Sequence, residues 1–361
     1  GQKTESRSIE EIYAQQSLDN SYFGLSVLSG IAYYYQFRSY AKTQDSTKLV
    51  IYLNEMQTWE RAFNASFLKY QPNIKRIGYQ HSSVAKRIFH YYSERTQESK
   101  GFSEPLPDYF AVNGKIPKQE LTKSYGDKII TLEALRQLQT RGQSNFRSKK
   151  NVKDLRKILY IGSYDRYEAI KILDFVSEAA GEDFNTEGNI TQNGEVVFAK
   201  IGLGVIDEVI VKPHPSCDLT KEVRIRDTQI ETKMSISNDN LDDILPNIKF
   251  VIVGSSTAAI DAVRNNCKIY VPVFSDHIIL SPLSGYDDFF TYVSEPRELI
   301  RSIDDWTDEF SDDYSDPLYN RNKFETDEES ERKIKEKFIE DFWLLEKSLS
   351  KWKDLISRCL K

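Results

Sequence analysis

The chain has 361 residues, of which 39% are hydrophobic and 12% aromatic. This length exceeds one ordinary hydrophobic core and predicts two domains. The formal net charge of −6 argues against a general attraction to nucleic acid, and no apolar run approaches the roughly 18 residues of a transmembrane helix. The three cysteines fit neither a disulfide framework nor a metal-binding spacing, which is typical of a reducing cytoplasm.

The first part of the chain alternates between short apolar runs and helical patterns. Each apolar run ends in polar residues before the next helix begins, which indicates βαβ units and a parallel sheet. A helix rich in Tyr, Leu and Ile is expected to be buried at residues 22–38, and a shorter helix is expected at 8–16. The other predicted elements are strands at 48–53, 75–80, 107–114 and 128–132 and helices at 59–70 and 119–125.

Residues 139–155 are polar, basic and prone to turns, so we interpret them as an interdomain linker. A second alternation follows. The acidic residues 304–331 are expected to form a surface loop, and apolar residues then recur every three or four positions from 333 to 360, which predicts one long amphipathic helix. The predicted strands of this second part lie at 157–162, 209–212, 250–253, 268–273 and 288–293, with a first helix at 167–180.

This pattern predicts an α/β protein with two Rossmann-like domains of parallel strands. The domains are residues 1–145 and residues 146–332, and residues 333–361 form a C-terminal helix that packs across them. The chain has neither the glycine pattern of dinucleotide-binding enzymes nor the P-loop of nucleoside triphosphatases, which argues against both classes. Acidic pairs such as Asp287-Asp288 lack the spacing of a metal-binding loop, so we expect no metal site.

A cationic turn follows the predicted strand that begins at Val209. The strand leads directly into Lys212-Pro-His214-Pro215, in which two prolines restrict the backbone on either side of one imidazole. In open α/β sheets, ligands bind just outside the carboxyl ends of the strands. The turn therefore predicts a site that stabilises a leaving phosphate, although a lone histidine can also be an ordinary surface residue.

A second polar turn follows the predicted strand at 250–253. Gly254, Ser255, Ser256 and Thr257 separate this strand from a helix, and the first N–H groups of a helix attract anions. We interpret this turn as a phosphate seat. Ordinary helix capping uses the same N–H groups and is compatible with that interpretation.

Polar residues also end the strands of the first domain. Glu55 follows the strand at 48–53 and precedes a helix that carries Trp59, so it is a candidate acid–base residue if its surroundings raise its pKa. Asp165 follows the first strand of the second domain and is either a cap of the next helix or a residue that faces the cleft. The remaining candidate positions on the first domain are Asn54, Gln80, His81 and Ser82.

Taken in order, these motifs resemble those of a known family. Lys212-Pro-His-Pro215, followed about forty residues later by Gly254-Ser-Ser-Thr257, resembles the His-Pro and Ser-Ser/Thr motifs of bacterial GT-B sialyltransferases and Kdo transferases. The first domain adds Asn54-Glu55-x-x-x-Trp59-Glu60, Gly78-Tyr-Gln-His-Ser-Ser83 and Pro107–Gly114. Over roughly residues 48–293 the chain is similar to the retaining β-Kdo transferases of lipopolysaccharide O-antigen and capsule assembly.

The resemblance implies a GT-B fold and a metal-independent transferase that moves an ulosonic acid, most simply Kdo, from its CMP-activated donor to a surface polysaccharide. The donor is a substrate, and no further cofactor is implied. His214 and Pro215, beside Lys212, would contact the CMP. The turn residues Gly254, Ser255, Ser256 and Thr257 would bind its phosphate or the donor carboxylate.

On the acceptor side the resemblance makes Glu55 the acid–base residue, with Asn54, Trp59, Gln80, His81 and Ser82 around the acceptor. Asp165 is the candidate carboxylate nucleophile of a retaining reaction. If it is not, the reaction is expected to be inverting and sialyltransferase-like, with a single base. The motifs are also compatible with a UDP- or CDP-dependent relative, either epimerase-like or a polyol-phosphate transferase, and with an inactive scaffold.

The resemblance also implies where such an enzyme works. The acceptor would be an oligosaccharide or a lipid-linked glycan, and nucleic acid is not an expected partner. We expect a cytoplasmic protein that can associate peripherally with the inner face of the membrane or with other polysaccharide-assembly enzymes. The donor sugar, the linkage and the oligomeric state stay open at this point.

Overall fold

The structure is a computed structural model. It describes residues 8, 11–12, 15–16, 24–84, 86, 91, 105–139, 154–181, 184–185, 189–190, 196–197, 200–201, 206–228, 233–311 and 321–361. The chain forms two compact units. Unit 1 comprises Gly1–Ser82, Phe89–Leu135 and Phe342–Lys361, and unit 2 comprises Ser83–Ile88 and Arg136–Asp341. The predicted linker at 139–155 lies almost wholly outside the described residues.

Unit 1 is built on a parallel sheet of four strands in the order β1-β2-β3-β4. One face of the sheet packs against α3 and α2, where Phe63 and Phe67 are buried. Ile77 and Tyr79 of β2 pack instead with Trp352 and Leu355 of α12. The elements of unit 1 are α2 (Leu25–Ala41), β1 (Leu49–Asn54), α3 (Thr58–Tyr70), β2 (Lys75–Gln80), β3 (Tyr109–Val112), α4 (Lys115–Tyr125), η2 (Gly126–Lys128), β4 (Ile129–Thr131) and α12 (Ser350–Leu360), and α5 (Leu135–Gln139) begins at its last residue before unit 2.

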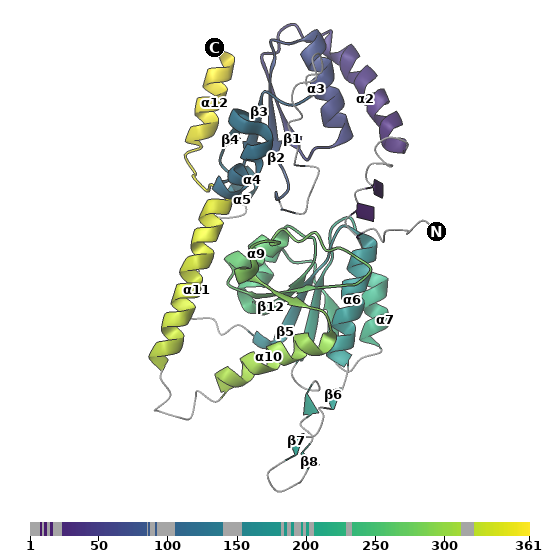
Figure 1. Ribbon diagram of the computed structural model, residues 1–361, viewed down its shortest axis with the longest axis vertical. Coiled ribbons are helices and arrows are strands. Elements are labelled where there is room, and N and C mark those ends of the chain that lie inside the picture. The colour runs from purple at the N-terminus through teal and green to yellow at the C-terminus, as the bar shows by residue number, and fades with distance from the viewer. Residues whose placement is uncertain are drawn as a thin grey trace, which may run out of the picture. The chain divides into compact units, whose positions relative to one another are not determined.

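Unit 2 is built on a parallel sheet of six strands in the order β11-β10-β5-β12-β13-β14. Figure 1 labels β5 and β12 within this sheet. All six residues of β12 are buried, as expected for a central strand covered on both faces. The strands are β5 (Asp154–Ile161), β10 (Glu208–Lys212), β11 (Lys233–Ile236), β12 (Ile248–Val253), β13 (Lys268–Pro272) and β14 (Thr291–Val293).

The helices of unit 2 connect these strands. In the sequence, two short antiparallel pairs of strands, β6 with β9 and β7 with β8, come between α6 and β10. The helices are α6 (Arg166–Gly181), α7 (Thr220–Asp227), α8 (Leu241–Ile244), η3 (Leu245–Asn247), α9 (Ala258–Arg264), η4 (Asp287–Phe289), α10 (Pro296–Ser311) and α11 (Arg321–Phe342). The short strands are β6 (Phe184–Asn185), β7 (Asn189–Ile190), β8 (Val196–Val197) and β9 (Lys200–Ile201). The prediction of an α/β, GT-B-like chain with two units of parallel strands is confirmed for each unit.

The C-terminal residues differ from the single helix predicted for 333–360. α11 ends at Phe342, and α12 begins at Ser350 after an irregular segment. Leu344 leaves the helical path because its N–H donates to the Asn113 carbonyl (2.6 Å) and its carbonyl accepts from Ala134 (2.9 Å). Leu349 then adopts a left-handed backbone with φ of 54°. Tertiary hydrogen bonds therefore overrule a periodic pattern that would otherwise continue the helix.

The start of α12 is held by a buried carboxylate from unit 1. Glu133 is fully buried, and its side chain accepts hydrogen bonds from the N–H groups of Lys351 (2.9 Å) and Trp352 (3.2 Å). These are N–H groups of the first helical turn, which have no partner within the helix. Glu133 thus fixes α12 against the sheet.

Two other predictions need correction. The acidic stretch 304–331 was predicted as a loop, yet α10 extends to Ser311 and α11 starts at Arg321. Glutamate and lysine favour helices, and pairs such as Arg332 with Glu336 one turn apart support α11 (3.3 Å). The helix predicted to be buried at 22–38 does form, as α2, but much of its surface is exposed. None of the described helices is long and apolar enough to span a membrane.

Candidate functional site

The carboxyl edge of the unit 2 sheet is a topological switch point. From β5 the chain moves outward to β10 and β11, and it then returns past β5 to β12 and continues in the opposite direction. In open α/β sheets, ligands bind outside the carboxyl ends of the two strands where the direction reverses. Three of the predicted polar turns follow strands that end at this edge. These turns are residues 162–165 after β5, 213–215 after β10 and 254–257 after β12.

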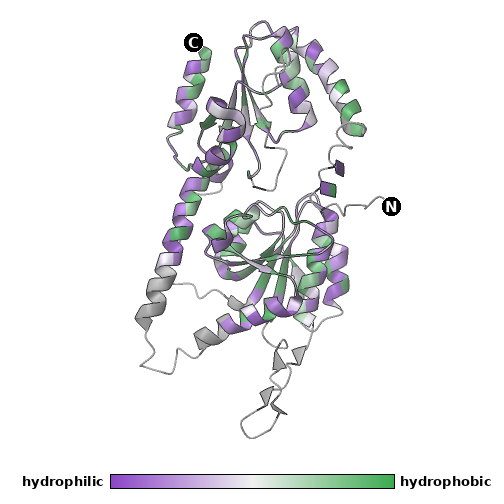
Figure 2. Cartoon of the chain, viewed as in Figure 1, coloured by the Kyte–Doolittle hydropathy of each residue, from purple (hydrophilic) through white to green (hydrophobic). Residues whose placement is uncertain are grey.

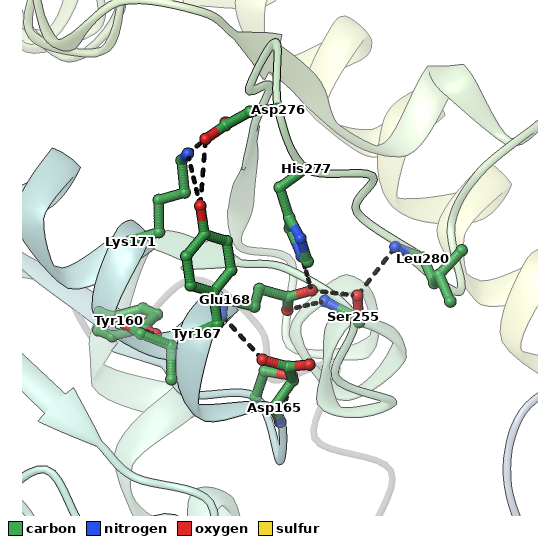
Figure 3. Close-up of polar contacts among 11 residues, drawn as sticks. Tyr160, Asp165, Tyr167, Glu168, Lys171, Ser255, Asp276, His277 and Leu280 are labelled. Atoms are coloured by element: carbon green, nitrogen blue, oxygen red, sulfur yellow. Dashed lines mark hydrogen bonds and ion pairs between the residues drawn. The ribbon is translucent and has the colours of Figure 1, made fainter. Parts of the chain in front are cut away.

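Glu168 joins two of these turns. It lies in the first turn of α6, and only 2% of it is exposed. Its Oε1 accepts a hydrogen bond from the Ser255 N–H (2.8 Å), and its Oε2 accepts one from the Ser255 hydroxyl (2.6 Å), as Figure 3 shows. His277 Nε2 lies 3.2 Å from the same Oε2. A buried carboxylate therefore fixes the turn after β12 to the helix after β5.

Both the N–H and the hydroxyl of Ser255 are used in these hydrogen bonds. Its hydroxyl oxygen also accepts a hydrogen bond from the Leu280 N–H (2.8 Å). Among the described residues no hydrogen bond uses the backbone N–H of Ser256 or Thr257, which precede α9. Of the residues predicted to hold a phosphate, Ser256 and Thr257 therefore keep backbone donors for a ligand, whereas Ser255 holds the turn in shape.

Steric crowding explains why residue 254 is a glycine. A Cβ atom added to it would lie 2.4 Å from Glu168 Oε1 and 2.8 Å from Ile172 Cδ1. Both distances are shorter than van der Waals contact, and Glu168 is held by Ser255 and cannot easily retreat. Glycine thus allows the turn after β12 to lie directly on Glu168.

A polar and aromatic rim borders this carboxylate. The Tyr167 ring lies edge to face with the His277 ring (5.5 Å), and its hydroxyl donates to Asp276 Oδ2 (3.1 Å). Lys171 pairs with the same Asp276 carboxylate (Figure 3). Glu168, His277 and this rim were not among the residues predicted from the sequence. For Glu168 one signal was available, because Asp165-x-x-Glu168 has the spacing of a helix capping box.

His214 is half-buried in the turn after β10. The Ser216 N–H donates to its Nδ1 (3.2 Å), and the Ser216 hydroxyl lies 2.7 Å from the same nitrogen. Because Nδ1 acts as an acceptor, the neutral ring carries its proton on Nε2, which can then donate to a ligand. Burial lowers the pKa of His214 from its ordinary value of 6.5, which favours this neutral form at neutral pH.

The turns after β5 and β10 touch at Gly162. A Cβ atom added there would lie 3.2 Å from the His214 nitrogen and 3.3 Å from the Pro213 Cα. Both are backbone atoms, and Pro213 and Pro215 leave the turn little freedom to adjust. The position of His214 therefore depends on the absence of a side chain at Gly162.

Replacement of Gly162 by alanine is expected to move His214 by a few tenths of an ångström. If this edge binds a nucleotide, as the resemblance implies, its affinity should fall roughly tenfold in a calorimetric titration, while the melting temperature changes by only a few degrees. As a control, Gly181→Ala alters a glycine at the end of α6 and should leave affinity unchanged. Unaltered affinity in Gly162→Ala would contradict the placement of the ligand beside His214.

Asp165 caps α6. Its Oδ1 accepts a hydrogen bond from the Glu168 N–H (3.0 Å), as the capping interpretation of this residue predicts. The residue is half-buried and lies at the carboxyl end of β5, one of the two strands at the switch point. Its position is compatible with contact to a ligand, and its role as nucleophile stays a prediction.

The acceptor-side candidates also gather at one sheet edge, in unit 1. Asn54 and Gln80 end β1 and β2 as paired residues, and both are buried. Gln80 accepts a hydrogen bond from the Asn113 N–H (3.0 Å), and Ser82 lies 2.6 Å from the Tyr91 hydroxyl. Glu55 is half-exposed directly after β1, and His81 is exposed directly after β2.

Trp59 takes a different position from the other candidates. Its ring packs against Phe37 (6.4 Å) and Tyr52 (5.9 Å) in the aromatic cluster between β1, α2 and α3. This packing gives Trp59 a structural role in unit 1.

Glu60, one turn into α3, is the buried carboxylate of this edge and was not among the candidates. It is 2% exposed, and its Oε1 accepts a hydrogen bond from the Glu55 N–H (2.9 Å). Its Oε2 is buried and has no hydrogen-bond partner among the described residues. Burial raises the pKa of Glu60 to about 6 from an ordinary value of 4.5. Glu60 therefore fixes the backbone that carries Glu55.

The raised pKa of Glu60 predicts a pH effect on stability. Because the folded pKa lies above the unfolded one, the folded state binds more protons between pH 4.5 and 6, so this residue contributes less stability as the pH rises through that window. We expect the free energy of unfolding of Glu60→Gln, relative to that of the wild type, to rise by about 1.5 kcal/mol between pH 4.5 and pH 7. Urea unfolding at both pH values measures this difference, and an equal pH dependence of the two proteins would contradict it.

Among the described residues no three His, Cys, Asp or Glu side chains are grouped so that they could hold a metal ion. No protein-family model matches the chain. No curated protein is similar to it at a significant level.

Solved structures with a similar course of the chain include UDP-GlcNAc 2-epimerase from Neisseria meningitidis bound to UDP-GlcNAc. It has 12% identity and a TM-score of 0.45, and the match covers 77% of this chain and 73% of that one. The S. aureus MnaA–UDP structure has 11% identity and a TM-score of 0.46 over 77% and 70%. A structure of the wall teichoic acid polymerase TagF has 11% identity and a TM-score of 0.40, and the match covers 86% of this chain and 72% of that one.

Proposed function

We propose that the chain is a nucleotide-sugar-dependent glycosyltransferase whose unit 2 binds the donor. The observation that supports this most is that three polar turns follow the neighbouring strands β10, β5 and β12 at one edge of the unit 2 sheet, beside its switch point. Lys212 is the last residue of β10, and His214 lies in the turn after it. The backbone N–H groups of Ser256 and Thr257 lie in the turn after β12, at the same edge of the sheet. Donors and a cation of this kind suit a phosphate that gains negative charge as a sugar departs.

We further propose that the donor is a CMP-activated ulosonic acid. This part rests on the resemblance of Lys212-Pro-His-Pro215 and Gly254-Ser-Ser-Thr257 to the motifs of CMP-dependent transferases. A CMP leaving group has a single phosphate. A neutral histidine donor, one lysine and a few backbone N–H groups are a modest set of charges that fits a single phosphate without a metal ion.

The acceptor is proposed to bind at the unit 1 edge. In this proposal Glu55 accepts the proton of the acceptor hydroxyl as that oxygen bonds to the anomeric carbon. In a retaining reaction, Asp165 first displaces CMP and forms a glycosyl ester, which the acceptor oxygen then breaks. One oxygen of Asp165 caps α6, and Oδ2 takes no hydrogen bond among the described residues. The acceptor is an oligosaccharide or lipid-linked glycan of a bacterial surface polysaccharide.

Nucleotide binding tests the first step of this proposal. Thermal-shift measurements with CMP, UDP and CDP should show stabilisation by CMP. A nucleotide present at a hundred times its Kd stabilises a protein by about 2.7 kcal/mol. Preferential stabilisation by UDP or CDP would favour a relative with another donor, such as an epimerase-like enzyme or a polyol-phosphate transferase. Stabilisation by none of the three would favour an inactive scaffold.

Transfer activity tests the second step. Wild-type protein is incubated with CMP-Kdo, with and without a glycan acceptor, and CMP release and product mass are measured. We expect CMP release that depends on the acceptor and falls roughly a hundredfold in Glu55→Gln. Undiminished transfer by Glu55→Gln would remove Glu55 from the proposal while leaving the donor site intact. The anomeric configuration of the product decides between the retaining and the inverting reaction.

A further inference from the structure

Helix α2 of unit 1 presents an unusually apolar surface to solvent. Phe37, on its inner side, packs against Phe63 of α3 (5.3 Å). Many of its other residues are exposed, including Leu25 (81%), Leu28 (65%) and Ile31 (51%). The outer face of α2 is defined here by six large side chains: Leu25, Leu28, Ile31, Tyr33, Tyr35 and Tyr40.

The outer face of α2 carries no charge. Arg38 is the one charged residue in the sequence of α2, and it is only half-exposed. The small polar residues Ser29, Gln36 and Ser39 occupy the other exposed positions for which the side chain is described, apart from Ala32. In Figure 2 the first turns of α2 are strongly apolar. A surface helix with apolar residues on its solvent side usually has a partner for that side.

A basic cluster lies at the C-terminal end of this face. Arg38, Lys42 and Lys69 surround the Tyr70 ring, at 5.7 Å, 5.1 Å and 5.6 Å from its centre. None of the three forms an ion pair with a carboxylate among the described residues. Three unpaired cations on a chain of net charge −6 form a local positive patch that an anionic surface can neutralise.

An apolar groove adjoins the outer face of α2. It has a volume of about 550 Å³ and lies between α2 and α3, where Ile31, Tyr35, Ala62 and Ala65 line it beside Arg61. Arg61 adds a further exposed cation, while Glu60, the acidic residue of α3, is buried. The exposed surface that α2 and α3 share is therefore apolar, aromatic and cationic, without an exposed carboxylate on either helix.

We propose that the outer face of α2 docks unit 1 onto an anionic lipid bilayer. Leucine and isoleucine enter the boundary between headgroups and acyl chains, and tyrosines lie at the level of the headgroups. The basic cluster neutralises lipid phosphates, and the groove between α2 and α3 accepts part of an acyl chain. A helix that lies on the surface in this way has an uncharged outer face and cations at its border, which is the arrangement of α2.

Charge complementarity favours a bilayer over a second copy of the chain. A second copy docked through the same two helices would offer these cations no partner, because α2 has no carboxylate and Glu60 of α3 is buried, whereas anionic lipid headgroups would neutralise them. The chain's own residues 1–23 are a third candidate occupant, and if they covered the face the protein would not bind lipid. The experiment below distinguishes all three occupants.

Sedimentation with lipid vesicles tests the proposal on the full chain. The vesicles contain phosphatidylcholine alone or phosphatidylcholine with phosphatidylglycerol, at low and high salt. We expect binding only to the anionic vesicles, and weaker binding at high salt. The double substitution Leu28→Glu/Ile31→Glu and the double substitution Lys42→Glu/Lys69→Glu should each weaken binding at least about tenfold.

The matched control places two carboxylates on unit 2, where Ile225 (45%) and Ile334 (56%) are similarly exposed. Ile225→Glu/Ile334→Glu should bind anionic vesicles like the wild type, and circular dichroism verifies that each variant is folded. Equal binding by Leu28→Glu/Ile31→Glu and the wild type would overturn the proposal, as would absence of binding to anionic vesicles. A wild-type dimer that the same substitution dissociates, without any vesicle binding, would assign the face to a second copy.

Discussion

Replacement of Glu168 by alanine is expected to destabilise the protein by about 3 kcal/mol. The substitution leaves the half-buried Ser255 N–H without a partner and opens a cavity beneath Gly254. For a unit of this size the loss corresponds to a fall of roughly 10 °C in the melting temperature. Urea unfolding and thermal unfolding measure the two quantities.

Two further variants separate the causes of this loss. Glu168→Gln keeps the volume but offers one acceptor oxygen in place of two, so it should recover only part of the stability. Asp174→Ala, on the same helix, removes an exposed ion pair with Arg226 and should cost no more than about 0.5 kcal/mol. If Glu168→Ala were as stable as Asp174→Ala, the turn after β12 would not depend on Glu168.

Replacement of His214 by alanine is expected to lower transfer about a hundredfold while the protein stays folded. Loss of one donor to a developing negative charge typically reduces turnover by this amount. His214 is half-exposed, and among the described residues its side chain forms hydrogen bonds only with Ser216 of its own turn, so its removal should change stability little. Turnover of CMP-Kdo and the affinity for CMP are the measurements.

Two lysines provide a control for charge. Lys212→Ala removes a cation at the carboxyl end of β10 and should weaken CMP binding. Lys233→Ala removes one at the amino end of β11, where it pairs with Glu208 (3.1 Å), and should leave CMP binding unchanged.

Since burial lowers the pKa of His214, the contribution of its neutral ring should persist from about pH 6.5 to pH 8. Equal activity of His214→Ala and the wild type would contradict the proposed donor site.

Most strands of the two parallel sheets could be predicted because the signal is local, whereas β11 (Lys233–Ile236) was not among the predicted strands. Parallel strands buried on both faces read as continuous apolar runs, as in Phe250–Val253, and each ends in turn residues. The helices at 304–331 could not be predicted from composition alone. A high content of acidic residues is typical of surface loops, but glutamate and lysine at helical spacing also stabilise a helix.

The exposure of α2 was the least predictable feature of unit 1. Its sequence is apolar on nearly all sides, and such a helix is normally buried. Burial depends on how many neighbours pack around a helix, and the sequence does not contain this number. The same limitation applies to the break before α12, which depends on hydrogen bonds of Leu344 to Asn113 and Ala134.

The candidate site was predictable in its positions and less so in its contacts. His214 and Gly254–Thr257 follow strands that turn out to end at one switch point, which a strand order read from the sequence could not establish. The sequence pattern Asp165-x-x-Glu168 suggested local capping, yet Glu168 reaches Ser255, 87 residues away. Glu60 likewise reads as a helix residue, and only the structure shows that it holds the backbone of Glu55.

A crystal structure with bound CMP is the decisive test of the proposed donor site. We expect the phosphate at the carboxyl edge of the unit 2 sheet, within hydrogen-bond distance of His214 Nε2 and of the backbone N–H groups of Ser256 and Thr257. Glu168 should keep its bonds to Ser255 in this complex. CMP bound elsewhere on the chain, or a phosphate at this edge that touches neither His214 nor the turn after β12, would contradict the proposal.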